Sequence, residues 1–260
     1  MSEEVHPRAD ELDTLSTLEL VTIMHSEDAN AVAAMAPHLG DMARAVDATA
    51  DRLRSGGRLH YFGAGTSGLI AAMDAAECPA TFGVAEDAVQ AHAALERGEE
   101  DDRGAGQNAA REAALRPSDV VVGISASGRT AYVLGALEEA TDRGTLTIAI
   151  TCNPRSRMTH GVDIAIEIPT GPEVIAGSTR LKAGTVQKLV LNTLSTGVFT
   201  RLGHTYRGRM VAVVAGNEKL RARAARIVAD LGGMTVDEAR RRLAEAGGDV
   251  RAVLAAVRHT

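Results

Sequence analysis

The sequence predicts an α/β protein with a doubly wound parallel sheet, N-terminal helices and a small C-terminal helical bundle. Residues 58–200 alternate short apolar runs with helical patterns, which is the rhythm of β-α-β units on a parallel sheet. Only 2% of the 260 residues are aromatic and none is tryptophan, so the core must consist of Ala, Val, Leu and Ile. Such a core suits helices packed closely on a sheet.

The first 55 or so residues are predicted to be helical. Ser16 and Glu19 have the spacing of a capping box, in which each side chain bonds the backbone N–H of the other residue. A second helix follows, and its apolar face is ended by Ser-Gly-Gly at 55–57. The residues on that face are Met42, Val46, Thr49 and Leu53.

The next part of the chain supplies the predicted sheet. Buried strands are expected at 58–63, 119–125 and 146–151, because each apolar run is followed by a polar or Gly-rich turn and then by a helical pattern. Residues 162–169 alternate apolar with polar side chains, which places this strand nearer a sheet edge. Residues 182–203 are predicted to form a long, mostly buried helix.

After residue 212 the composition changes to helices rich in Arg, Ala and Glu. Thr235 and Glu238 have capping-box spacing, Gly247 and Gly248 end that helix, and Asp249 begins another. We therefore divide the chain into an N-terminal helical arm (1–48), a sheet domain (49–212) and a C-terminal helical bundle (213–260).

Composition and charge exclude several classes of protein. The net charge of −6 argues against nucleic acid as a partner. Cys78 and Cys152 cannot form a disulfide framework and fit a reducing compartment. The polar N-terminus does not resemble a signal peptide, and no apolar run reaches the roughly 18 residues of a membrane span. The eight histidines lack metal-ligand spacing. We expect a cytoplasmic protein without a metal site.

A glycine-rich loop, Gly-Ala-Gly-Thr-Ser-Gly at 63–68, has the G-x-G-x-x-G spacing of a dinucleotide-binding turn. That interpretation requires an acidic residue about 20 positions further on, at the end of a second strand. Glu86 and Asp87 lie near that distance, but the preceding residues, Ala-Thr-Phe-Gly-Val-Ala, make a poor strand. The alternative is another kind of phosphate, because a loop that enters a helix presents free N–H groups to an anion.

Two further polar loops favour a terminal phosphate group. The second, 123–130, follows a predicted strand and precedes a helix, and the third, 177–185, leads into the long helix. A phosphate monoester has charged oxygens that accept hydrogen bonds from hydroxyl and N–H donors. The alternative is that these hydroxyls only cap helices. The three loops together predict a sugar-phosphate site formed by Gly65, Thr66, Ser67, Ser125, Ser127, Gly128, Thr130, Ser178, Arg180 and Lys182.

Five stretches of the sequence strongly resemble the N-acetylmuramic acid 6-phosphate etherases, a family with the sugar isomerase fold. They are GAGTSG, DAAECPATFG, VVGISASGRTAYV, GSTRLKAGTVQKLVLNTLSTG and NEKL. The resemblance implies a homodimer in which residues 49–212 form a sugar isomerase-type phosphosugar-binding domain. It implies cleavage of the lactyl ether of N-acetylmuramic acid 6-phosphate to N-acetylglucosamine 6-phosphate and D-lactate, in cell-wall sugar recycling.

The chemistry of such a reaction needs an acid and a base but no cofactor. Once the sugar ring opens, the C1 aldehyde acidifies the C2 proton, and a base removes it while an acid protonates the departing lactate oxygen. Water then adds across the C2–C3 double bond. Two carboxyl groups in different environments can share these tasks. The resemblance assigns them to Glu77 and Glu100, with Glu99 as the alternative to Glu100. We assign Glu77 as the acid, because we expect its apolar surroundings to bury it partly, and Glu100 as the base.

Three cations, Arg129, Arg180 and Lys182, are candidates for contact with the lactyl carboxylate or the phosphate. Gln187 and Lys188 lie on the long, mostly buried helix and could line the site, but we assign them no role. The chain departs from the family pattern at five positions, which puts its substrate preference and turnover in question. Leu69 replaces an arginine, His6 an asparagine and Ala212 an aspartate, while prolines are replaced at Ala80 and Ala131.

Two other functions remain open at this level. Regulators that sense a sugar phosphate and bind a protein partner resemble these etherases, but a regulator has no need for Glu77 and Glu100. An aldose–ketose phosphosugar isomerase could use the same base at C2 without an acid at C3. Isomerisation of a sugar phosphate without lactate release would favour the isomerase.

Overall fold

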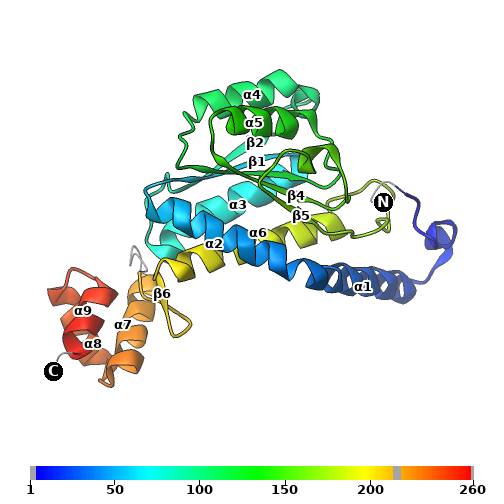
Figure 1. The fold of residues 1–260 in the computed structure, drawn as a ribbon. Coiled ribbons are helices and arrows are strands. Elements are labelled where there is room, and N and C mark those ends of the chain that lie inside the picture. The colour runs from blue at the N-terminus through cyan, green and yellow to red at the C-terminus, as the bar shows by residue number, and fades with distance from the viewer. Residues whose placement is uncertain (1–3, 213–217, 259–260) are drawn as a thin grey trace.

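The protein is a three-layer α/β/α sandwich with a separate helical lobe, as the ribbon shows (Figure 1). The computed structural model describes residues 4–212 and 218–258. The central sheet is parallel throughout and has the order β2-β1-β3-β4-β5. Its strands are β1 (Leu59–Ala64), β2 (Val89–Ala94), β3 (Val120–Ser125), β4 (Leu146–Thr151) and β5 (Ile164–Glu167). The predicted doubly wound sheet is confirmed.

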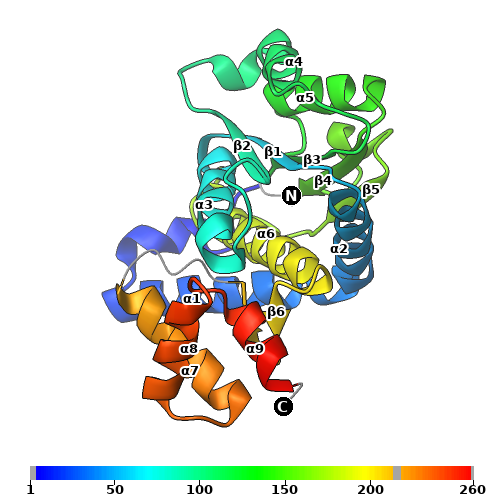
Figure 2. The same ribbon diagram turned by 90° about the vertical axis from the view of Figure 1, so that its left-hand side faces the viewer.

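Helices cover both faces of the sheet. On one face lie α2 (Leu39–Arg54), α3 (Gly65–Phe82) and α6 (Lys182–Arg201), and on the other lie α4 (Arg103–Glu112) and α5 (Ala131–Asp142) (Figures 1 and 2). Alternate residues of each strand serve the two cores, so that Val120 and Val122 of β3 face the first set of helices and Val121 faces the second. The predicted strands at 58–63, 119–125, 146–151 and 162–169 correspond to β1, β3, β4 and β5.

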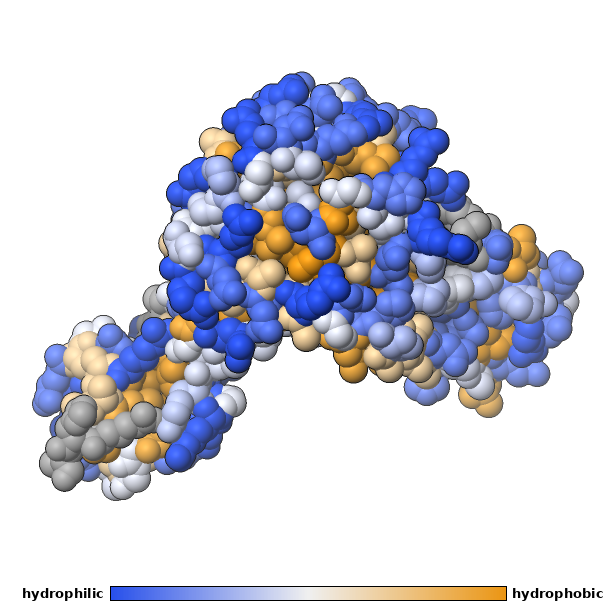
Figure 3. All heavy atoms as spheres, viewed as in Figure 1, coloured by the Kyte–Doolittle hydropathy of each residue, from blue (hydrophilic) through white to orange (hydrophobic). Residues whose placement is uncertain are grey.

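The first helix forms an arm that extends from the sandwich. Helix α1 (Thr17–Ala33) begins with the predicted capping box between Ser16 and Glu19. Its inner side contacts α6, whereas Leu18, Val21 and Val32 are exposed. Apolar side chains are visible along this arm among hydrophilic ones (Figure 3). Short 3-10 turns flank the arm at Ala9–Thr14 and Ala36–His38.

The C-terminal helices form a lobe with its own core. After α6 the chain makes a small hairpin of β6 (Thr205–Tyr206) and β7 (Arg209–Met210). The lobe comprises α7 (Glu218–Gly232), α8 (Val236–Glu245) and α9 (Val250–Arg258), whose buried residues form a cluster distinct from the two sheet cores. The Thr235 side chain caps α8 by accepting from the Glu238 N–H, as its position predicts.

The glycines of the first loop are required by packing. A Cβ on Gly63 would lie 2.9 Å from the Gly68 nitrogen, and a Cβ on Gly68 would lie 2.8 Å from the Gly63 oxygen and 2.9 Å from the Ala93 Cβ. Gly65 has a φ of +52°, which residues other than glycine rarely adopt. The G-x-G-x-x-G spacing thus lets α3 approach β1 and β2 closely, and it does not by itself indicate a nucleotide.

Two histidines lie side by side on neighbouring strands, the buried His60 of β1 and the half-buried His92 of β2. His60 Nδ1 is 3.1 Å from His92 Nε2, and the His92 ring stacks on Phe62 with centroids 4.4 Å apart. Burial lowers the pKa of His60 to about 4, with further contributions from His92 and Arg58. Burial also lowers the pKa of His92 to about 4. Both rings are therefore neutral in the folded protein near neutral pH.

We predict that this pair makes the protein acid-sensitive. Both folded-state pKa values lie below the unfolded value of about 6.5, so the unfolded chain binds more protons as the pH falls from 6.5 towards 4. Each histidine should lower the free energy of unfolding by about 1.4 kcal/mol per pH unit in that window. Urea denaturation at several pH values measures the slope. His92→Gln should reduce it, and replacement of the exposed His25 by Gln should leave it unchanged; equal slopes in all three proteins would contradict the prediction.

Candidate active site

The first two hydroxyl-rich loops lie side by side at the carboxyl edge of the sheet. Strand β1 leads into residues 63–68 and β3 leads into residues 125–130, and these two strands are parallel neighbours. From β1 the chain order runs to β2 on one side and to β3 on the other. The loops therefore flank the switch point of the strand order, where open α/β sheets bind their ligands.

The second loop is organised around Ser125. The Ser125 Oγ accepts from the Gly128 N–H at 3.0 Å and lies 2.8 Å from the Thr130 Oγ1. The Ser127 Oγ accepts from the Arg129 N–H at 3.2 Å. Gly128 has a φ of +66° and is held tightly against Ser156 and Thr151. The loop thus gathers three hydroxyl groups at the start of α5.

The helices that follow these two loops begin without side-chain caps. Among the residues that the structure describes, no side chain caps the N-terminus of α3 at Ala64 or that of α5 at Thr130. The first N–H groups of a helix have no partner within it and carry partial positive charge. Two such N-termini beside several hydroxyl groups make an environment suited to a multiply charged anion.

The third loop is adjacent but organised differently. Ala183 packs with Ala126 and Cys152, and a Cβ on Gly184 would lie 3.4 Å from the Thr66 Cγ2. The start of α6 is already capped, because the fully buried Glu173 carboxylate accepts from the Lys182 and Ala183 N–H groups at 2.9 and 3.0 Å. Sequence reasoning missed Glu173, since no local pattern connects it to α6.

Lys182 does not present its ammonium group openly to the loops. The side chain is 3% exposed and its Nζ pairs with the Glu27 carboxylate of α1. Burial would raise the pKa of Glu27, but the hydrogen bond and charge of Lys182 hold it below its usual value. His6 Nε2 lies 3.7 Å from the same carboxylate. Lys182 therefore ties the arm to the start of α6.

The other predicted cations are more accessible. Arg129 and Arg180 are exposed, and within residues 4–212 and 218–258 neither guanidinium forms an ion pair. Ser178, like Thr66 and Ser127, is half-buried. Arg129 and Arg180 are thus better placed than Lys182 to meet an incoming carboxylate.

The two predicted catalytic glutamates lie on different elements and in different regions of the surface. Glu100 lies in the 3-10 turn Glu99–Asp101 that follows the carboxyl end of β2. Glu77 lies twelve residues beyond Gly65, about 18 Å along α3 towards the amino edge of the sheet. Glu77 is exposed in the single chain. The expectation that its apolar sequence neighbours bury it partly is therefore wrong for one chain alone. The adjacent Ala75 and Cys78 are buried against the sheet, whereas Ala76 and Glu77 lie on the outward face of α3.

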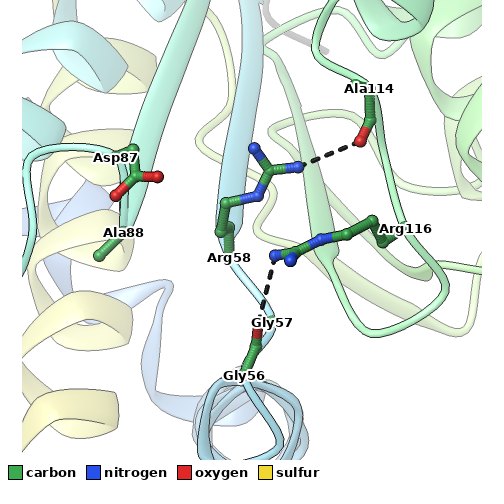
Figure 4. Close-up of a pocket in the computed structure, with 7 residues that line it drawn as sticks. All are labelled: Gly56, Gly57, Arg58, Asp87, Ala88, Ala114 and Arg116. Carbon is green, nitrogen blue, oxygen red and sulfur yellow. Dashed lines mark hydrogen bonds between the residues drawn. The ribbon is translucent and has the colours of Figure 1, made fainter.

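The acidic residues of the dinucleotide interpretation lie at the wrong edge. Glu86 and Asp87 precede β2, so they lie at the amino edge of the sheet. There Asp87 lines a hollow of about 550 Å³ together with Arg58 and Arg116 (Figure 4). Both arginines bond the buried Asp119 carboxylate, and these bonds hold its pKa far below the usual value despite its burial. This hollow is remote from the loops.

The described residues contain neither a candidate metal-binding group nor a candidate membrane-spanning helix. Within residues 4–212 and 218–258, no three His, Cys, Asp or Glu side chains are grouped so as to hold a metal ion. No helix in that part of the chain is both long and apolar enough to cross a bilayer.

The fold and the paired loops define a class, and comparison with known proteins agrees. Residues 25–152 match the SIS domain family. Phosphoheptose isomerase from Francisella tularensis superposes with a TM-score of 0.54 at 20% identity, over 72% of this chain and 100% of the other. The Vibrio vulnificus NanR protein complexed with ManNAc-6P gives a TM-score of 0.53 at 16% identity, over 72% of this chain and 65% of the other. Residues 25–152 therefore carry a SIS domain, and the solved structures share its fold.

Closer relatives identify the family. An N-acetylmuramic acid 6-phosphate etherase of Symbiobacterium thermophilum is 50% identical over 257 residues, which cover 95% of this chain and 85% of the relative. Those of Thermobifida fusca and Nostoc sp. are 46% and 49% identical over 94% and 92% of this chain, and over 82% and 80% of their own lengths. The chain belongs to the N-acetylmuramic acid 6-phosphate etherase family.

Proposed function

We propose that this protein cleaves the D-lactyl ether of N-acetylmuramic acid 6-phosphate, giving N-acetylglucosamine 6-phosphate and D-lactate. The observation that carries the proposal is the pair of hydroxyl-rich loops at the switch point, in a chain that belongs to this etherase family. Ser67 and Thr66 of the first loop and Ser125, Ser127 and Thr130 of the second would hold the phosphate. The N–H groups at the starts of α3 and α5 would add to its binding.

The remaining groups would perform the elimination. With the phosphate in the loops, Glu100 follows the neighbouring strand β2 and is proposed to remove the C2 proton. Glu77 is proposed to protonate the lactate oxygen as the C3–O bond breaks, and water then adds at C3. Arg180 and Arg129 are proposed partners of the lactyl carboxylate, since a guanidinium can donate two parallel hydrogen bonds to it.

The homodimer is proposed because one chain alone leaves Glu77 exposed. Glu77 lies on the outer side of α3 among apolar neighbours, where Leu69 and Met73 are 56% and 44% exposed and Ala72 and Ala76 are also exposed. A second copy that covers this stripe would remove Glu77 from water. Its own Glu100 follows the carboxyl end of β2, whereas Glu77 lies about 18 Å along α3 towards the amino edge of the sheet. We therefore propose that each Glu77 acts together with the Glu100 of the other copy.

Mixing two inactive variants tests this shared site. If each site combines Glu77 of one copy with Glu100 of the other, a heterodimer of Glu77→Gln and Glu100→Gln chains contains one intact site. Random exchange of subunits in an equal mixture should then restore about a quarter of wild-type lactate release. If both glutamates of a site come from one chain, every site in the mixture lacks one of them and activity stays at the variant level.

The domain division and the compartment are further proposals. The separate core formed by Val211 and by residues between 224 and 254 supports a boundary near 212. The other proposed boundary, at residue 48, falls inside helix α2. The part of α2 before it already packs on the sheet, because Met42 and Val46 belong to one of the sheet cores. The cytoplasm is proposed as the compartment because Cys78 and Cys152 are both free and buried.

Product analysis separates the proposed activity from its alternatives. The purified protein is incubated with N-acetylmuramic acid 6-phosphate, and lactate and sugar products are followed by proton NMR. Stoichiometric release of lactate and N-acetylglucosamine 6-phosphate supports the etherase. Unchanged substrate with shifted resonances would indicate a phosphosugar-sensing regulator. Conversion of glucosamine 6-phosphate or fructose 6-phosphate without lactate release would indicate an isomerase.

A further inference from the structure

A buried glutamine on α6 contacts the first phosphate loop from behind. Gln187 is 1% exposed, and its Oε1 accepts from the Ser67 Oγ at 2.9 Å. Its Nε2 is also buried and has no hydrogen-bond partner among the described residues. A buried amide group that makes only one of its hydrogen bonds is uncommon, because the unmade bonds are lost on burial.

The arrangement matters because a serine hydroxyl has only one proton to donate. With the amide oriented as it stands, that proton is engaged by the Gln187 Oε1, and Ser67 can only accept from a ligand. A phosphate oxygen is itself an acceptor, so the Ser67 hydroxyl cannot donate to it in this state. Rotating the amide by 180° places Nε2 where Oε1 stands without moving the other heavy atoms. The hydroxyl then accepts from Gln187 and is free to donate.

We propose that Gln187 is a positioning residue whose amide rotates when phosphate binds. In the free protein Ser67 donates to Gln187, and in the complex Gln187 donates to Ser67, which donates to a phosphate oxygen. The bond to the charged oxygen compensates for the Oε1 that is left without a donor. This inference rests on the proposed phosphate binding at the first loop, and it assigns Gln187 to phosphate affinity and not to the elimination.

A double-mutant cycle with Ser67 tests the proposal. The probe is N-acetylglucosamine 6-phosphate, and its dissociation constant is measured by calorimetry for the full-length protein. In Gln187→Glu the new carboxylate can only accept, so it retains the Ser67 proton and should weaken binding by about 10- to 100-fold. In Gln187→Met, Ser67 is free to donate but loses its supporting donor, so binding should weaken less, by roughly 2- to 10-fold. Thermal denaturation shows whether each variant folds.

The Ser67→Ala background separates positioning from general effects. If Gln187 acts through the hydroxyl, both substitutions at 187 should have little further effect once the hydroxyl is gone. Equal losses with and without Ser67 would overturn the proposal, because they would reflect charge or packing alone. The Met variant decides the matter if the Glu variant does not fold. Failure of the wild-type protein to bind the probe would instead contradict the proposed function.

Discussion

Replacement of Glu100 or of Glu77 by glutamine is expected to lower lactate release by about 10²- to 10⁴-fold, the usual contribution of a general acid or base. The two variants should differ in a second reaction. If Glu100 is the base, Glu100→Gln stops exchange of the C2 proton with deuterated water as well. If Glu77 is the acid, Glu77→Gln retains that exchange although the ether remains intact. Steady-state assays and proton NMR measure the two reactions.

Glu99 provides a matched control for Glu100. It lies in the same 3-10 turn, and its carboxylate accepts from the Glu96 N–H. Glu99→Gln should therefore keep near-normal turnover. A large loss in Glu99→Gln with normal activity in Glu100→Gln would move the role of base to Glu99. Near-normal turnover in both Glu77→Gln and Glu100→Gln would exclude the assigned roles.

Replacement of Gly128 by alanine is expected to disable the second phosphate loop. Its φ of +66° disfavours any side chain, and an added Cβ would overlap the Ser156 side chain and lie 2.8 Å from the Thr151 Oγ1. The loop must shift, which separates the Gly128 N–H from Ser125 and misplaces the hydroxyls around it. We expect the Michaelis constant for the phosphorylated substrate to rise by about 10- to 100-fold.

Gly144 is the control for backbone strain. It has a comparable φ of +71°, but a Cβ at that position would meet nothing within 4 Å, and it lies beyond α5 and away from the loops. Gly144→Ala should therefore lower stability by about 1 kcal/mol without changing the Michaelis constant. Equal Michaelis constants for Gly128→Ala and the wild-type protein would show that the second loop does not bind the phosphate.

Local sequence was sufficient to predict those elements whose cause is local. Strands β1, β3 and β4 are short apolar runs that end in polar or Gly-rich loops. Both capping residues, Ser16 and Thr235, act within three positions of themselves. Strand β2 escaped prediction because its sequence, Val-Gln-Ala-His-Ala-Ala, is dominated by small residues. Ala93 lies against Gly68 at the close approach of α3. That requirement arises from packing and leaves no local pattern.

The site was less predictable because its geometry depends on distant contacts. The spacing of the two hydroxyl loops identified them, and the sheet order brings them together. The ion pair of Lys182 with Glu27 joins residues 155 positions apart, and the Glu173 cap of α6 crosses a loop. Similarly, the apolar neighbours of Glu77 in the sequence indicated burial, but the helical period directs Glu77 to the exposed side of α3.

Solvent isotope labelling distinguishes breakage of the ether by elimination and addition of water from direct displacement. N-acetylmuramic acid 6-phosphate is converted by the purified protein in deuterated water, and the product sugar is analysed by NMR. Elimination and rehydration should place one deuterium at C2 of N-acetylglucosamine 6-phosphate for each lactate released. Release of lactate with the original hydrogen retained at C2 would contradict this mechanism, because direct displacement at C3 leaves that bond intact.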